Sequence, residues 1–182
     1  ITSGHNPEIP GDETGSWSFE GLGAGTYVVR EVPPAGYTQT FPNTATGSWI
    51  VTLTASGMTF ENVNFGNAPR PGSICGVKFL DKNRDGQRQS NEPLLPGWVI
   101  FLDLNHNGVR DPGEPVTTTS TDGHYCFDNL GPGTYDVHET LKNGWNQTKP
   151  GDPAAFYLIT LGTAQVVNNV DFGNIPGTYT GT

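Results

Sequence analysis

The chain has 182 residues, a mass of 19.5 kDa and a formal net charge of −9, from 18 acidic and 9 basic side chains. This acidic surplus argues against nucleic acid and anionic membranes as partners, since both bind basic surfaces. The 25 glycines and 15 prolines interrupt helices and exclude a helical bundle. Because the apolar residues fall in short aromatic and β-branched runs, the composition predicts an all-β protein.

Neither a membrane span nor a signal peptide is expected in this segment. No apolar run reaches the roughly 18 residues that a spanning helix needs, and the opening residues ITSGHNPEIP lack a charged and an apolar region. We therefore expect no membrane insertion here. Both ends of the sequence look like cuts through a longer, repetitive protein.

A repeated unit organises the chain. Residues 15–31, GSWSFEGLGAGTYVVRE, align with residues 123–139, GHYCFDNLGPGTYDVHE. We expect tandem immunoglobulin-like β-sandwich modules, divided as follows: an incomplete first repeat with its front half missing at 1–66, a proline-rich linker at 67–73, a complete calcium-binding repeat at 74–174, and a linker or the start of a next unit at 175–182.

Alternation and turn residues predict seven strands in the second repeat, at residues 75–80, 98–102, 116–120, 124–127, 133–140, 156–161 and 166–172. Seven short strands in about 100 residues favour a sandwich of two sheets. Tyr135 and Val137 share one face of their strand, which is the predicted inward face. Cys75 and Cys126 either form one disulfide, which would fit an extracellular location, or are two buried free thiols.

Between the first three of these strands lie two segments with the spacing of calcium ligands. The first loop, residues 81–92, offers oxygens from Asp81, Asn83, Asp85, Gln87, Gln89 and Glu92. The second loop, residues 103–114, offers them from Asp103, Asn105, Asn107, Val109, Asp111 and Glu114. Calcium takes six to eight hard oxygens, glycine at the sixth position permits the sharp turn, and the seventh position gives a backbone carbonyl. The sequence predicts one Ca²⁺ in each loop; the alternative is a pair of acidic turns that bind nothing.

The second repeat resembles the B-type repeat of bacterial serine-aspartate repeat surface adhesins. The resemblance rests on GVKFLDKNRDG at 76–86, EPLLPGWVIFLD at 92–103 and TDGHYCFDNLGPGTYDVHE at 121–139. It implies a calcium-stabilised immunoglobulin-like sandwich, related to the B-type domains of collagen adhesins, and arrays of such modules in stalks. Related collagen-adhesin modules often carry a Lys to Asn isopeptide cross-link. Glu139 and Asn174 occupy the positions of its acid and its Asn, but Lys78 does not fit the expected lysine register, so no cross-link is expected.

Other conspicuous residues indicate packing or surface positions rather than chemistry. His5, His106, His124 and His138 lack paired metal-ligand spacing and are interpreted as surface residues. The four tryptophans are interpreted as core or half-buried packing, because Trp17 and Trp49 are replaced by tyrosines in the second copy. Asn146 begins the single N-x-S/T sequon and is a candidate glycosylation site. No catalytic motif occurs, and we expect no enzyme.

These observations predict a calcium-stabilised structural module of an extracellular stalk, fibre or surface layer. One alternative is an adhesin module that binds a host protein or glycan, and another is an accessory domain of a secreted carbohydrate-active enzyme. The expected partners are neighbouring repeats or copies of the same protein. If the missing front strands of the first repeat come from a neighbouring copy, a head-to-tail filament results.

Overall fold

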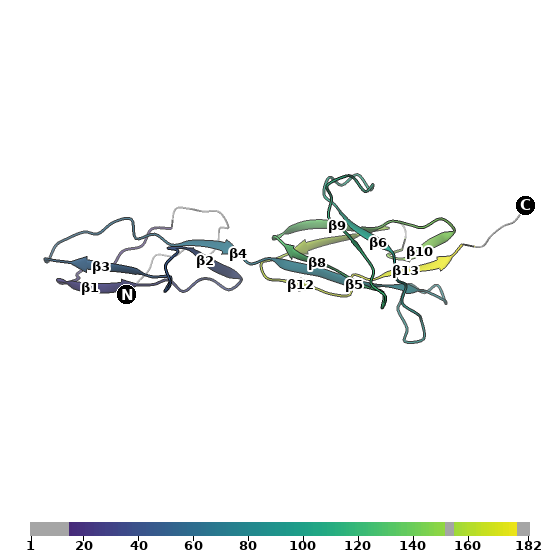
Figure 1. Cartoon of the computed structure of the whole chain (residues 1–182), viewed down its shortest axis with the longest axis horizontal. Coiled ribbons are helices and arrows are strands. Elements are labelled where there is room, and N and C mark those ends of the chain that lie inside the picture. Colours follow the sequence, from purple (N-terminus) through teal and green to yellow (C-terminus); the bar gives the residue numbers. More distant parts are fainter. Residues whose placement is uncertain (1–14, 152–154, 178–182) are drawn as a thin grey trace, which may run out of the picture. The chain divides into compact units, whose positions relative to one another are not determined.

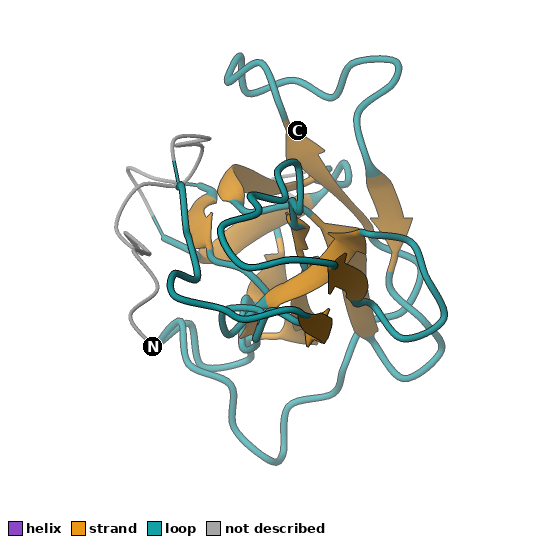
Figure 2. Ribbon diagram, turned by 90° about the vertical axis from the view of Figure 1, so that its left-hand side faces the viewer, coloured by secondary structure: helices purple, strands orange, loops and turns teal. Residues whose placement is uncertain are grey.

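A computed structural model describes residues 15–151 and 155–177 of the chain. These residues form strands and loops but no helix (Figure 2), which confirms the all-β prediction. The described part of the chain therefore contains no helix that is long and apolar enough to cross a membrane. The chain divides into two compact units, one made of Ile1–Pro34 and Gln39–Ala68 and the other of Ala35–Thr38 and Pro69–Thr182.

The first unit has a small core. Its described strands form two pairs, β1 (Gly25–Val29) with the antiparallel β3 (Trp49–Leu53) and β2 (Tyr37–Phe41) with β4 (Gly66–Pro69). The buried residues Val51, Leu53 and Val63 pack with half-buried aromatic side chains such as Trp17 and Trp49. Alternate residues on the outer faces of β1 and β3 stay exposed, as expected of strands that bury one face.

The second unit is a sandwich of two sheets (Figure 1). One sheet has the order β10 (Trp145–Lys149), β13 (Phe172–Pro176), β5 (Gly72–Leu80) and β12 (Val166–Val167), with β8 (His124–Leu130) also paired to β5. The other has the order β11 (Tyr157–Leu161), β9 (Gly133–Glu139), β6 (Val99–Asp103) and β7 (Val116–Thr118). Both sheets contribute to one buried core of Ile74, Ile100, Leu102, Tyr125, Phe127, Val137, Leu161, Val170 and Phe172. This arrangement confirms the predicted immunoglobulin-like sandwich.

Alternation along the strands explains which side chains enter this core. In β9, Val137 is fully buried and Tyr135 packs against the core from the same face, as the sequence predicts. Strand β5 is covered more completely, and Gly76 lies against the backbone of Val170. A Cβ added at Gly76 would stand 2.0 Å from the carbonyl oxygen of Val170, so this close approach requires glycine.

Three features differ from the expected strand pattern. Strand β10 was not predicted, because its sequence WNQTK contains a single large apolar residue; it pairs with β13 through its backbone. The predicted strand at 166–172 is two strands, β12 and β13, separated by residues that belong to neither. The segment 67–73, predicted as a linker, lies largely in β4 and at the start of β5. All three depend on pairing with distant strands, which local sequence does not encode.

Candidate metal-binding loops and a buried lysine site

The two candidate calcium loops have the same backbone-capping pattern. The carboxylate of Asp81 accepts a hydrogen bond from the N–H of Gly86 at 2.9 Å, and that of Asp103 accepts one from Gly108 at 2.6 Å. In both loops the other oxygen of this aspartate accepts from the residue before the glycine, at 3.2 and 3.3 Å. The carboxylate of the first residue of each loop thus caps the backbone N–H groups of the turn.

The glutamate at the end of each loop closes the turn in the same way. Glu92 accepts hydrogen bonds from the N–H groups of Lys82 at 2.7 Å and Gln89 at 3.0 Å. Glu114 accepts from the second and ninth residues of its own loop, each at 2.9 Å. Both oxygens of each glutamate therefore face the loop interior, where the first aspartate also lies.

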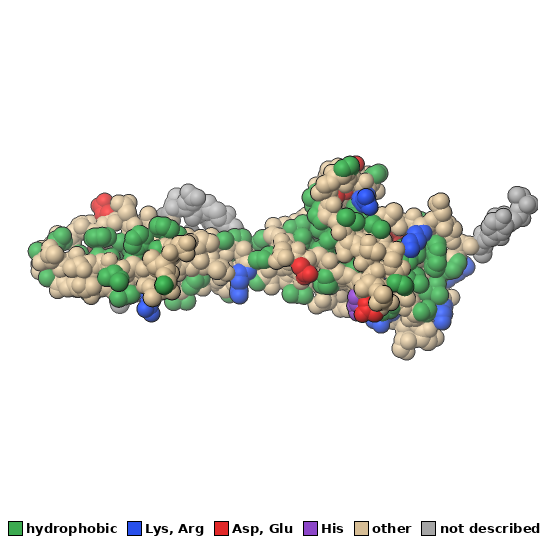
Figure 3. All heavy atoms as spheres, viewed as in Figure 1, with side chains coloured by type: hydrophobic (Ala, Val, Ile, Leu, Met, Phe, Trp, Pro, Cys, Tyr) green, Lys and Arg blue, Asp and Glu red, His purple; other side chains and the backbone are tan. Residues whose placement is uncertain are grey.

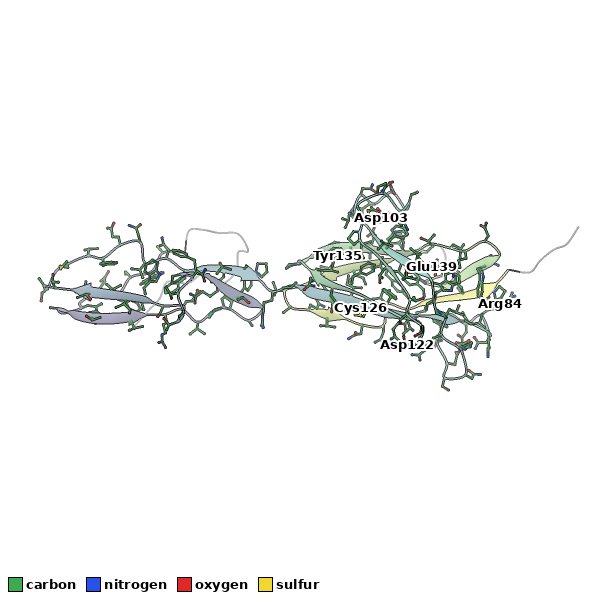
Figure 4. The ribbon with its side chains drawn as sticks, viewed as in Figure 1. Arg84, Asp103, Asp122, Cys126, Tyr135 and Glu139 are labelled. Carbon is green, nitrogen blue, oxygen red and sulfur yellow. A yellow bond between two sulfur atoms is a disulfide. The ribbon has the colours of Figure 1, made fainter. Side chains whose placement is uncertain are left out.

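Left-handed backbone at matching positions produces this curl. The φ angles are 63° at Arg84 and 70° at Gly86 in the first loop, and 60° at His106 and 76° at Gly108 in the second. Glycine adopts these angles without steric cost, whereas they are uncommon for other residues. Figure 4 labels Arg84 in the first loop and Asp103 at the base of the second.

Hydrogen bonds within each loop connect most of the remaining predicted ligands. Asp85 accepts hydrogen bonds from the N–H of Gln87 and the side chains of Asn83 and Gln89, and the bond from Gln87 is the main cause of its lowered pKa. In the second loop the side chains of Asn105 and Asn107 both donate to Asp111, at 2.8 and 2.7 Å. The side chain of Val109 has no oxygen, so this position can offer only its backbone carbonyl.

These donors fit a hard cation. Asp81 is 0% and Asp103 1% exposed, and the donors that each loop offers are oxygens of carboxylates, side-chain amides and a backbone carbonyl. Burial alone would raise the pKa of Asp103, but N–H groups led by that of Gly108 hold it below its usual value, so the carboxylate stays ionised. The six predicted ligands of each loop thus offer the oxygen atoms that calcium prefers.

A second cluster lies inside the sandwich. Lys78 of β5 contacts the side-chain oxygen of Asn174 on β13 and the carboxylate of Glu139 on β9, and the Asn174 amide donates to Glu139 at 2.7 Å. Lys78 and Asn174 are 0% exposed. Figure 4 labels Glu139 of this cluster. The expectation that Lys78 lies out of register was wrong, because parallel pairing of β5 with β13 brings the two side chains together.

Burial changes the protonation of this cluster. Desolvation lowers the pKa of Lys78 to about 8 despite the neighbouring Glu139, and desolvation likewise raises the pKa of Glu139. The Lys78 amine lies 4.4 Å from the centre of the Trp98 ring, which excludes water on that side. A lysine in this setting reaches its neutral, nucleophilic form more easily than one in water.

Cys75 and Cys126 form a disulfide between β5 and β8, which confirms the bonded alternative. Asn146 is exposed on β10, so the sequon is open to solvent. Trp98 is buried and Trp145 half-buried, with their rings packed edge to face, which confirms their interpretation as packing residues.

The histidines are less scattered than the sequence suggested. His138 is partly buried and lies with Asp103 and Asp136 in a group of potential metal ligands, and His106 contacts Asp136 at 2.8 Å. The interpretation as surface residues was therefore wrong for the partly buried His138. It holds for the exposed His106 and His124, and His5 lies outside the described residues.

The sequence of this chain is similar to those of known proteins. The SdrD B-like domain family matches residues 72–155. Over 148 residues, 75% of this chain, the chain is 34% identical to serine-aspartate repeat-containing protein C of Staphylococcus aureus. It is 35% identical over 135 residues, 71% of this chain, to Colossin-A of Dictyostelium discoideum. The chain spans only 15% and 1% of the lengths of these two relatives.

Among solved structures, pilus proteins match parts of this chain. The full-length major pilin SpaD of Corynebacterium diphtheriae matches 59% of this chain and 32% of its own, with 19% identity and a TM-score of 0.40. The group B streptococcus pilus 2b backbone protein matches 86% and 53%, with 17% identity and a TM-score of 0.44. It is the sequence match over β5 to β10, on a two-sheet sandwich, that assigns the second unit of this chain to the SdrD B-like domain family.

Proposed function

We propose that the second unit is a structural module of an extracellular stalk, fibre or surface layer, stabilised by one Ca²⁺ in each of its two loops. The observation that carries this proposal is the shared hydrogen-bond pattern of the loops, in which an aspartate and a glutamate converge at matching positions. Membership of a surface-adhesin domain family supports the extracellular location. The function is mechanical stiffening.

Each ion would link a loop to the strand before it. Asp81 directly follows β5 and Asp103 is the last residue of β6, so both first ligands belong to rigid parts of the sandwich. Without a cation, three carboxylates in each loop repel one another, since Asp85 or Asp111 lies between the aspartate and the glutamate. Free Ca²⁺ at about a hundred times its dissociation constant would stabilise the unit by roughly 2.7 kcal/mol per site.

Calcium titration of chelator-treated protein tests this proposal. Isothermal calorimetry should give two ions per chain, and Glu92→Gln and Glu114→Gln should each remove one of them. The exposed Asp128 on β8 belongs to neither loop, so Asp128→Asn serves as the matched control with two ions retained. Weak uptake that neither glutamate substitution changes would show that the loops are acidic turns.

A covalent brace would add to this stiffness. In this step the neutral amine of Lys78 attacks the side-chain carbonyl carbon of Asn174, forming a C–N bond while the C–N bond to the leaving ammonia breaks. Glu139 touches both the amine and the amide, so it can accept the proton from one and deliver it to the other. The product would covalently link β5, the first strand of the sandwich, to β13, the last. In a stalk these two strands would carry the mechanical load.

Mass spectrometry of the intact protein decides whether the brace forms. The mass should fall short of the sequence mass, corrected for the disulfide, by one molecule of ammonia, and a peptide joining Lys78 to Asn174 should survive reduction and proteolysis. Glu139→Gln should restore the missing ammonia. An uncross-linked wild-type chain would refute the brace and leave the calcium proposal intact.

The rival function, a binding module for a host protein or glycan, has less support. Aromatic platforms for sugars need exposed rings, whereas Trp98 is 2% exposed and is covered by Trp145 and by the Lys142 amine. The rival would be favoured if the wild type binds a glycan or matrix array and Trp145→Ala abolishes that binding.

A further inference from the structure

We propose that Asp103, Asp136 and His138 form a separate site for a divalent transition metal such as Zn²⁺, on the outer face of the β6–β9 pair beneath the second loop. Zinc binds imidazole nitrogen and carboxylate oxygen in four-coordinate sites, whereas calcium takes oxygen ligands alone. The imidazole therefore distinguishes this site from the calcium loops.

Strand register brings the three ligands together. Asp103 of β6 stands directly opposite Asp136 of β9, and Phe101 stands opposite His138. Residues two apart on a strand point to the same face, so Asp136 and His138 share the face opposite to the buried Val137. One ligand atom from each of the three residues lies within 4.8 Å of the others, and Nε2 of His138 is 3.8 Å from Asp103.

The charges of this cluster call for a cation. Like charges directly opposite each other on neighbouring strands are destabilising, yet Asp103 is 1% and Asp136 6% exposed. One oxygen of Asp136 is hydrogen-bonded to Nδ1 of His106 at 2.8 Å. The other oxygen is buried and has no hydrogen-bond partner. A buried carboxylate oxygen without a partner is costly, and a metal ion bound to it would remove that cost.

The imidazole is held in place for binding. The His138 ring lies parallel to the rings of Phe101 and Phe156, with centroid separations of 5.2 and 4.7 Å. His106 positions Asp136 through their hydrogen bond, in the way that outer residues orient metal ligands.

A comparison within the chain shows that the ligand set is specific to the second repeat. In the first repeat, Val28 and Arg30 occupy the positions of Asp136 and His138. Asp103 is in addition the first ligand of the second loop, so its two oxygens would serve both ions. Occupancy of the new site should therefore change calcium affinity at the second loop and leave the first loop unaffected.

Zinc and cobalt titrations of the full chain test the site with Ca²⁺ kept saturating. We expect one Zn²⁺ per chain, and a Co²⁺ complex with the visible absorption of a four-coordinate ion with a nitrogen ligand. His138→Phe fits the aromatic stack and should lower Zn²⁺ affinity at least tenfold, as should Asp136→Asn. His124→Ala, an exposed histidine outside the cluster, should leave affinity unchanged.

Each outcome of the zinc titrations either supports the proposed site or overturns it. Zinc uptake that His138→Phe leaves unchanged, or that only Glu114→Gln removes, would place the ion in the calcium loop and overturn the site. The absence of stoichiometric Zn²⁺ binding by the wild type would overturn it as well. If a variant fails to fold, the wild-type NMR spectrum decides, because Zn²⁺ must shift the His138 ring signals and not those of His124. Calcium stoichiometry is measured separately, so loss of the zinc site does not affect the test of the loops.

Discussion

The disulfide offers a prediction with a defined magnitude. Cys75 and Cys126 stand opposite each other on β5 and β8, and Cys126 is exposed while Cys75 is half-buried. Replacing both with serine therefore removes the covalent link with little loss of packing. The first repeat carries serine, Ser18, at the position of Cys126.

The loss of stability follows from the length of chain that the bond closes. The two cysteines lie 51 positions apart in the sequence. Loop-closure entropy for a loop of this size corresponds to about 4 kcal/mol at 25 °C. Since small domains are stable by roughly 5–15 kcal/mol, the double serine variant should lose a large share of the stability of the second unit.

Guanidinium unfolding with and without a reductant measures this effect. Wild type without reductant should be more stable than the double serine variant by about 4 kcal/mol, and wild type with reductant should match the variant. The variant itself should not respond to reductant, which controls for other effects of the reagent. A difference below about 1 kcal/mol would refute the argument that the bond stabilises through chain entropy.

Two further predictions concern backbone packing and pH. Gly76→Ala should destabilise the second unit by about 1–3 kcal/mol in chemical unfolding, because its Cβ would meet the Val170 carbonyl; Gly131→Ala, where nothing lies within 4 Å, is the control, and equal effects would contradict the packing argument. Desolvation lowers the pKa of His138, so the unfolded chain takes up a proton near pH 6.5 that the folded chain does not. In metal-free buffer the free energy of unfolding should fall as pH drops below 6.5, and His138→Phe should remove that part of the fall; an unchanged pH profile would contradict it.

Local sequence predicted the elements whose pattern is self-contained. The alternation in GTYDVHE places Val137 in the core, and the loop spacing places Asp81 and Glu92 in one hydrogen-bonded turn. These follow from side-chain period and turn chemistry, which act over a few residues.

Features that depend on strand pairing could not be predicted in this way. Lys78 meets Asn174 only because β5 and β13 run parallel, a pairing between segments 96 residues apart. Asp136 meets Asp103 only because of the register between β6 and β9. A shift of one residue would turn either side chain to the opposite face of its sheet, and the sequence contains no local indication of that register.

Thermal unfolding of the full chain in Ca²⁺ and in chelator tests the central claim most directly. Two occupied sites, each at about a hundred times the dissociation constant, would add roughly 5 kcal/mol to the second unit. For a domain of about 100 residues this raises Tm by more than about 15 °C. Glu92→Gln combined with Glu114→Gln should abolish the increase. Melting curves that coincide with and without Ca²⁺ would contradict the account.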